Sequence, residues 1–125
     1  MVSIIENELK EAFTEHISGR LAKAEALYKQ ILQSYPWHPD VNNNLGILLD
    51  GLGRHSEAVE FFKMSVEINP KRIENWENYI TCLIKLDKKQ EAKSIIQRSI
   101  KAGITSDLIK ELNKTNSRTK KKLQS

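Results

Sequence analysis

The residues of this chain that could bind a metal ion or act as a nucleophile are three histidines and one cysteine: His16, His38, His55 and Cys82. Zinc proteases carry two histidines at HExxH spacing, zinc fingers pair their cysteines, and many nucleotide-binding enzymes carry a glycine-rich phosphate loop. The sequence has none of these patterns, and a single cysteine allows neither an internal disulfide nor a cysteine-only zinc site. We therefore expect no catalytic residue, no metal site and no cofactor, and we expect that the protein is not an enzyme.

Composition favours one ordinary globular domain. The chain has 125 residues, of which 39% are hydrophobic and 29% charged. Glu6 and Glu8 interrupt the first apolar residues, so no signal peptide is predicted. No stretch approaches the roughly 20 apolar residues that a membrane span needs. We expect a cytoplasmic protein that makes no contact with a membrane.

Charge is concentrated at the C-terminal end. Residues 114–125 contain no acidic residue and five basic ones: Lys114, Arg118, Lys120, Lys121 and Lys122. The five positive charges of this segment exceed the net charge of +4 of the whole chain, so residues 1–113 carry a slight negative charge. A basic tail without aromatic residues is weak evidence for nucleic acid as a partner. We expect residues 114–125 to form a disordered tail, because they offer almost nothing apolar to bury.

An internal repeat organises the rest of the chain. Alanines recur at Ala24, Ala58 and Ala92, and prolines recur at Pro36 and Pro70, each 34 residues apart. Two further columns share this period: Tyr28, Phe62 and Ile96, and Gly19, Gly53 and Asp87. Such a period indicates stacked helical units, here at about residues 5–38, 39–72 and 73–104. The three histidines occupy different positions in these units and are not expected to converge.

Each unit is predicted to form two antiparallel helices. In the second unit, leucines recur at helical spacing up to Leu52, Gly53 permits a left-handed backbone at the helix end, and Pro70 ends the second helix. Small residues would let the paired helices approach, with Gly46 on the first helix and Ala58 on the second. The bulky residues of the aromatic column would then fill the wider end of each pair.

The motif Leu45-Gly46, Gly53, Ala58, Phe62 and Pro70 resembles the tetratricopeptide repeat family, over about residues 5–104. The resemblance implies an all-α fold, a superhelical solenoid of antiparallel helix pairs. It also implies a capping helix at about residues 105–113, which would complete a domain of residues 1–113. In the third unit Ile80 replaces the small residue of Gly46, so the helices of that unit must pack differently.

In this family the first helices of the repeats line a concave face that binds peptides. The resemblance therefore implies a groove lined by one set of residues: Lys10, Phe13, Asn43, Asn44, Ile47, Asn78, Thr81 and Lys85. Asn44 and Asn78 are one period apart, and they either form a ladder of amides able to pair with a peptide backbone or simply face water. Phe13 and Ile47 form either an apolar floor of the groove or part of the core. Trp37, between two units, is expected to plug the junction.

These features favour a scaffold or adaptor that binds a protein or peptide partner. An alternative is an accessory module that presents substrates to a glycosyltransferase or sulfotransferase, because the amide ladder resembles the repeats of O-linked N-acetylglucosamine transferase. A weaker alternative is a nucleic-acid-associated protein that acts through the basic tail. Self-association through an end repeat is left open.

Overall fold

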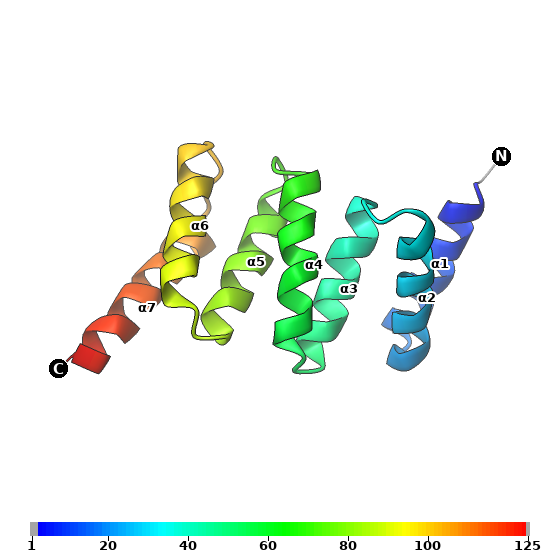
Figure 1. Cartoon of the computed structure of the whole chain (residues 1–125), viewed down its shortest axis with the longest axis horizontal. Helices are drawn as coiled ribbons and strands as arrows, with labels where there is room; N and C mark the ends of the chain where they lie inside the picture. The colour runs from blue at the N-terminus through cyan, green and yellow to red at the C-terminus, as the bar shows by residue number, and fades with distance from the viewer. Residues whose placement is uncertain (1–2, 125) are drawn as a thin grey trace.

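The computed structural model describes the backbone of residues 3–124 and the side chains of residues 3–118. Seven helices and no strands occur among these residues (Figure 1). They are α1 Ile4–Ile17, α2 Leu21–Ser34, α3 Pro39–Gly51, α4 His55–Ile68, α5 Ile73–Lys85, α6 Lys89–Lys101 and α7 Asp107–Gln124. The first six form three antiparallel pairs at the predicted units, so the all-α repeat fold is confirmed.

Local sequence sets the helix ends. Ser3 and Glu6 form a capping box at the start of α1, in which each side chain accepts from the backbone of the other. The turn between α3 and α4 contains Gly53 with a φ of 78°, as predicted. Asp87 occupies the same column between α5 and α6 and adopts a φ of 59°, so the left-handed turn persists where glycine is absent.

The core follows the predicted alternation of small and large residues. Ala24, Ala58 and Ala92 are completely buried between paired helices. A Cβ atom built on Gly46 would lie only 2.7 Å from Cε1 of Phe62, so the aromatic ring occupies the space that a side chain would need. In the third repeat, Ile80 of α5 and Ile96 of α6 occupy these two columns, and both are buried.

The array curves with the first helices of the repeats on its inner side. Cα atoms of α1 and α3, and of α3 and α5, approach within 8 Å, whereas within the described chain α2, α4 and α6 make no such approach to one another. Figure 1 views the outer side, with α4 in front of α3 and α5. The inner face formed by α1, α3 and α5 is the predicted concave face.

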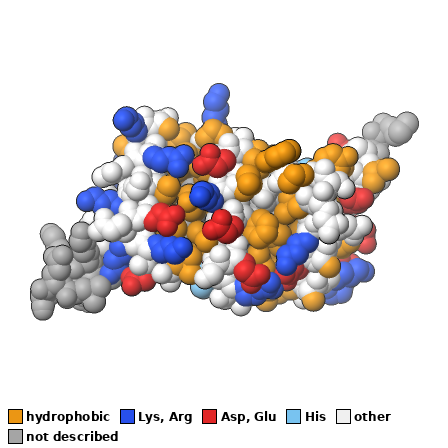
Figure 2. Space-filling view, in the orientation of Figure 1, with side chains coloured by type: hydrophobic (Ala, Val, Ile, Leu, Met, Phe, Trp, Pro, Cys, Tyr) orange, Lys and Arg blue, Asp and Glu red, His pale blue; other side chains and the backbone are white. Residues whose placement is uncertain are grey.

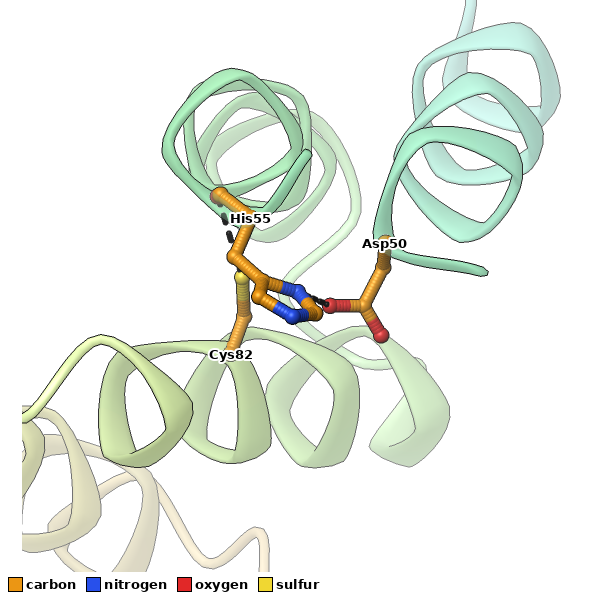
Figure 3. Close-up of side chains that lie close together, drawn as sticks. All are labelled: Asp50, His55 and Cys82. Atoms are coloured by element: carbon orange, nitrogen blue, oxygen red, sulfur yellow. Dashed lines mark hydrogen bonds and ion pairs between the residues drawn. The ribbon is translucent and has the colours of Figure 1, made fainter. Parts of the chain in front are cut away.

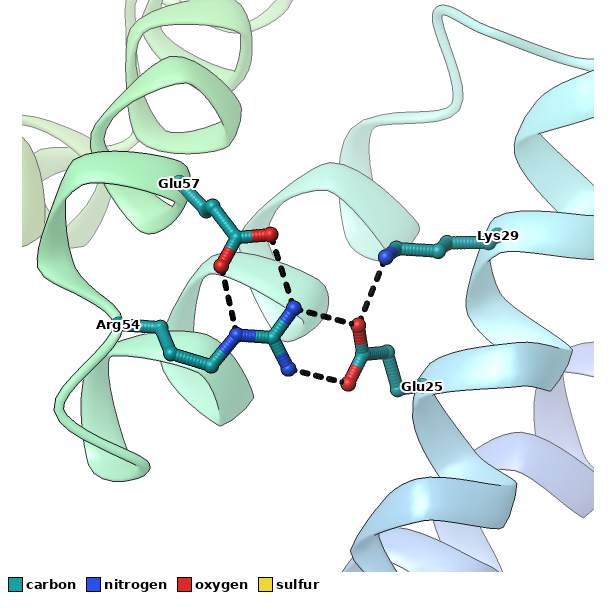
Figure 4. A network of polar contacts seen from close by, with 4 residues as sticks. All are labelled: Glu25, Lys29, Arg54 and Glu57. Carbon is teal, nitrogen blue, oxygen red and sulfur yellow. Dashed lines mark hydrogen bonds and ion pairs between the residues drawn. The ribbon is translucent and has the colours of Figure 1, made fainter.

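The outer face carries an ionic network and an apolar depression. Arg54 donates to both carboxylate oxygens of Glu25, at 2.6 and 2.9 Å, and to those of Glu57, at 2.6 and 2.8 Å (Figure 4). Lys29 also donates to Glu25, at 2.7 Å. The network joins repeats one and two.

The depression on the outer face has a volume of about 280 Å³. It is lined by Leu32, Pro36, Asn42, Glu60, Phe61 and Met64. Figure 2 shows hydrophobic side chains gathered on this face among mixed charges.

Helix α7 starts where the capping helix was predicted but extends beyond the predicted end of the domain. Ser106 accepts from the backbone N–H of Ile109, which is fully buried. Asn116 is also buried and donates to the carbonyl of Lys89 at 3.0 Å, so the boundary predicted at residue 113 falls inside the helix. Glu111 pairs with Lys114, three residues later, at 3.7 Å, and with Arg118, two turns later, at 3.6 Å. The tail side chains beyond residue 118 lie outside the described residues. None of the helices in the described chain has the length and apolar character to cross a membrane.

Candidate functional site

A hollow of about 430 Å³ opens on the inner face between repeats one and two. It is lined by Glu6, Leu9, Lys10 and Phe13 of α1, Asp40 and Asn44 of α3, and Arg72 just before α5. The α1 residues recur every three or four positions and therefore share one side of that helix. The hollow brings together three of the predicted groove residues, Lys10, Phe13 and Asn44.

The floor of the hollow is apolar and partly open to solvent. Phe13 is 46% exposed, and its ring lies edge-on to that of His16, with ring centroids 6.4 Å apart. Leu9 is half-buried and packs against the core. Ile47, further along α3, is 43% exposed. Of the two readings of Phe13 and Ile47, the structure therefore supports surface residues rather than core.

Asn44 provides an unused amide at the edge of this floor. Its side chain is half-buried, yet it makes no hydrogen bond to any residue that the structure describes. An amide offers two donor hydrogens and one acceptor oxygen, so it can pair with both groups of a peptide bond. This unused capacity lies beside exposed aromatic surface.

Charges of both signs rim the hollow. Arg72 lies 3.5 Å from Asp40 and 3.6 Å from Glu74, so it partly neutralises the acids at this end. Lys10 makes no ion pair with a described residue. Sequence reasoning missed Arg72, because it precedes α5 rather than lying on a first helix. Its position just after Pro70 was the available signal.

The remaining groove residues are arranged differently from the prediction. Asn43 is 4% exposed and accepts a hydrogen bond from the amide of Asn78 at 3.1 Å. Asn43 is therefore buried rather than lining an open groove as predicted, and of the two amides of the predicted ladder, that of Asn78 already donates within the protein. The reason is register, because the side of α3 that meets α5 carries Asn43. Thr81 is half-buried on α5.

Polar side chains of the inner face between α3 and α5 are paired with one another or with α7. Lys85 donates to Oδ2 of Asp50 at 2.8 Å, which links α5 to α3. Glu77 of α5 accepts from the hydroxyl of Ser106 at 2.7 Å, which links it to the start of α7. Lys85, predicted to face a ligand, is thus already paired within the protein.

The three histidines lie apart, as expected, but one of them meets the cysteine. His16 Nδ1 lies 3.0 Å from the Tyr28 hydroxyl, and His38 caps α3. His55 Nδ1 lies 2.6 Å from Oδ1 of Asp50, and its carbonyl accepts from the thiol of Cys82 at 3.4 Å (Figure 3). The sequence reasoning missed this cluster, because it compared the histidines only with one another.

Burial and hydrogen bonding shift the pKa values of Cys82 and Asp50 in opposite directions. Cys82 is fully buried, and burial, with a contribution from Asp50, raises the pKa of its thiol to about 11. Burial also acts to raise the pKa of Asp50, but hydrogen bonds from Lys85 and His55 outweigh it, and the pKa lies below its usual value. The thiol is thus protonated and the carboxylate ionised near neutral pH.

Trp37 does not plug the junction between repeats. It is 69% exposed, so that prediction is wrong. The junction is held instead by Asn42, whose amide donates to the carbonyl of Pro36 at 3.1 Å. One period later, the indole of Trp76 donates to the carbonyl of Pro70 at 2.7 Å. The same carbonyl is therefore satisfied by a different residue type in each repeat.

Known proteins share both the repeat and the fold. The photosystem I assembly protein Ycf3 from Cuscuta gronovii, and that from Cuscuta obtusiflora, are each 34% identical over 71 residues, covering 49% of this chain and 42% of the relative. The chain thus spans less than half the length of these curated relatives.

Solved structures align over nearly the whole chain. The Sgt2 TPR domain from Aspergillus fumigatus has a TM-score of 0.80 at 21% identity, covering 98% of this chain and 83% of that one. The first TPR of Spaghetti (RPAP3), bound to the HSP90 peptide SRMEEVD, has a TM-score of 0.79 at 16% identity, covering 97% and 94%. The Yersinia enterocolitica chaperone SycD, in complex with a peptide of the translocator YopD, has a TM-score of 0.72 at 17% identity, covering 94% and 90%.

At these identities the structural matches establish the fold alone. The sequence match is more specific, because residues 16–78, half of the chain, fit the profile of the family described as tetratricopeptide repeat. Together with the three stacked helix pairs and the capping helix, this match shows that the chain belongs to the tetratricopeptide repeat family.

Proposed function

We propose that this protein is an adaptor that binds an extended peptide segment of a partner protein in the hollow between α1 and α3. Families of this kind are generally protein-interaction modules rather than enzymes. Two of the structurally similar proteins, RPAP3 and SycD, were solved with a bound peptide. The proposal places the adaptor in the cytoplasm and assigns it no catalytic step.

The observation that carries the proposal is the unpaired amide of Asn44 beside the exposed ring of Phe13. Solvent reaches the polar atoms of this amide, so a peptide backbone can replace water there with its own hydrogen bonds. An exposed aromatic side chain offers a peptide an apolar contact of large area. The two together match the backbone and one side chain of an extended peptide.

The rim favours a peptide with an apolar anchor rather than one with a strong net charge. Glu6 and Asp40 are acidic, whereas Lys10 and Arg72 are basic, so the hollow presents both signs. Arg72 is already shared between two acids. We infer that an aliphatic or aromatic side chain of the peptide packs on Phe13 while Asn44 pairs with its backbone.

Peptide selection followed by mutation tests this site. A random peptide library displayed on phage would be selected against the full chain, and the affinity of the selected peptide measured by fluorescence anisotropy. Phe13→Ala and Asn44→Ala should each weaken binding about 10-fold, which corresponds to about 1.4 kcal/mol. Ile100→Ala is the matched control, because Ile100 is 50% exposed on α6, outside the hollow.

Two results would contradict the proposal. In one, both hollow variants bind with the affinity of the wild type while circular dichroism shows that all variants are folded. In the other, Ile100→Ala weakens binding as much as the hollow variants do. The amide of Asn78, half of the ladder that motivated a role beside a glycosyltransferase, already bonds to Asn43, so no observation favours a second function.

A further inference from the structure

Three side chains of different chemistry converge where repeats two and three meet. Asp50 lies at the end of α3, His55 is the first residue of α4, and Cys82 lies three residues before the end of α5. One ligand atom from each lies within 4.8 Å of the others. Figure 3 shows the imidazole of His55 between the carboxylate and the thiol, with the three side chains pointing toward one another from three helices.

These donors are the ones that a borderline transition metal prefers. Imidazole nitrogen, carboxylate oxygen and thiolate sulfur all bind Zn²⁺, and a site with three protein ligands keeps its fourth position for water. We propose that Asp50, His55 and Cys82 bind one divalent transition-metal ion of the Zn²⁺ class. The ion would join α3 and α4 of repeat two to α5 of repeat three.

The geometry requires only small side-chain movements. With bonds of about 2.0–2.3 Å, ligand atoms of a tetrahedral zinc site lie roughly 3.3–3.7 Å apart. The pair His55 Nδ1 and Asp50 Oδ1, now 2.6 Å apart, must open by about 1 Å to admit an ion, and the imidazole bound through Nδ1 then carries its proton on Nε2. The widest separation in the cluster, 4.8 Å at most, must close by about 1.5 Å or less.

Charge and access also fit such an ion. Binding releases the thiol proton of Cys82 to solvent and breaks its hydrogen bond to the carbonyl of His55. The thiolate and the Asp50 carboxylate then neutralise a divalent ion, while Lys85 keeps its bond to the other carboxylate oxygen, Oδ2. The side chains of His55 and Asp50 are 31% and 19% exposed, so the ion can enter from their side.

Cobalt absorption spectroscopy tests the proposal directly. The untagged full chain, treated with a chelator and kept reduced with a phosphine, would be titrated with Co²⁺. We expect one equivalent to produce the visible bands of a tetrahedral site together with a thiolate-to-cobalt charge-transfer band, and we expect Zn²⁺ to displace it. Cys82→Ser should abolish the charge-transfer band, and His55→Gln should weaken binding at least 10-fold.

His38→Gln is the control, because His38 caps α3 through a backbone contact and lies outside the cluster. It should keep the full spectrum. A second readout guards against misfolded variants, since an ion that binds only the folded chain raises its melting temperature. Zn²⁺ should raise the melting temperature of the wild type but not that of Cys82→Ser. A wild type that shows no charge-transfer band, or a band that persists in Cys82→Ser, would overturn the proposal.

Discussion

The two halves of the inner face are built from the same repeat but use their polar side chains differently. Between α1 and α3, the amide of Asn44 and the ammonium of Lys10 have no partner among the described residues, and Phe13 is 46% exposed. Between α3 and α5, Asn78 bonds to Asn43 and Lys85 bonds to Asp50.

This difference suggests how one scaffold separates binding from cohesion. Polar groups in the second half satisfy one another and hold repeats two and three in register. Polar groups in the first half are left for a ligand, and the ionic network of the outer face holds repeats one and two instead (Figure 4). The hollow can therefore remain open without loosening the array.

The largest expected effect concerns the packing on which both halves depend. Repeat two pairs Gly46 with Phe62, whereas repeat three places Ile80 and Ile96 in the same columns. Gly46→Ile should lower the free energy of unfolding by about 1–3 kcal/mol through overpacking. This loss of stability should exceed the stability gained by replacing a glycine inside a helix with a residue of higher helix propensity.

Adding Phe62→Ile to Gly46→Ile transplants the packing of repeat three into repeat two. Because the smaller side chain vacates the space that the new one needs, the double variant should recover part of the lost stability. Urea unfolding of the wild type, both single variants and the double variant forms a complete cycle. If the losses of the two single variants simply add in the double variant, the side chain at position 62 does not fill the space that a side chain at position 46 would need.

A smaller effect should separate the two asparagines of the inner face. Asn78→Ala leaves the buried carbonyl oxygen of Asn43 without its donor and should cost about 1 kcal/mol of stability. Asn44→Ala removes no hydrogen bond within the described chain, so its free energy of unfolding should match that of the wild type. Peptide affinity should show the reverse order. Equal stability losses in the two variants would remove the distinction between the halves.

The smallest effect is a dependence of stability on pH from the outer network. Hydrogen bonds from Arg54, and next from Lys29, lower the pKa of Glu25 to about 2 from an ordinary value of 4.5. As pH falls below 4.5 the unfolded chain takes up this proton while the folded chain does not. The contribution of Glu25 is therefore complete above that pH and is lost as pH falls toward about 2.

Urea unfolding at a series of pH values between neutrality and strong acid measures this loss. Glu25→Gln should reduce the slope of stability against pH in the acid range, because its side chain cannot titrate. The same substitution should leave peptide affinity unchanged, since Glu25 lies on the outer face. An unchanged slope would mean that the network does not hold repeats one and two together.

Periodicity predicted what repeats within a unit but not how one unit meets the next. The alanine column, the turn at Gly53 and the fit of Gly46 against Phe62 all follow from contacts inside a helix pair. The pairing of Asn43 with Asn78 depends on the rotation between successive pairs, which a common period leaves undetermined. The pattern therefore identified the correct helices, but it placed Asn43 in the groove although this side chain is buried against α5.

Contacts between residues of different columns were missed for the same reason. Asp50, His55 and Cys82 come from three helices and share no column, so comparison by period cannot bring them together. The extension of α7 depends on Asn116 reaching the carbonyl of Lys89, a contact with no counterpart in the repeats. Trp37 was misplaced because Asn42, rather than the indole, satisfies the junction carbonyl.

The most direct test of the central claim is a map of the peptide on the folded protein. Amide chemical shifts of the isotope-labelled full chain would be followed during titration with the selected peptide. The hollow predicts that the largest changes fall at Lys10, Phe13 and Asn44, including the side-chain amide of Asn44. Changes centred instead on the outer depression around Phe61 and Met64 would contradict a binding site between α1 and α3.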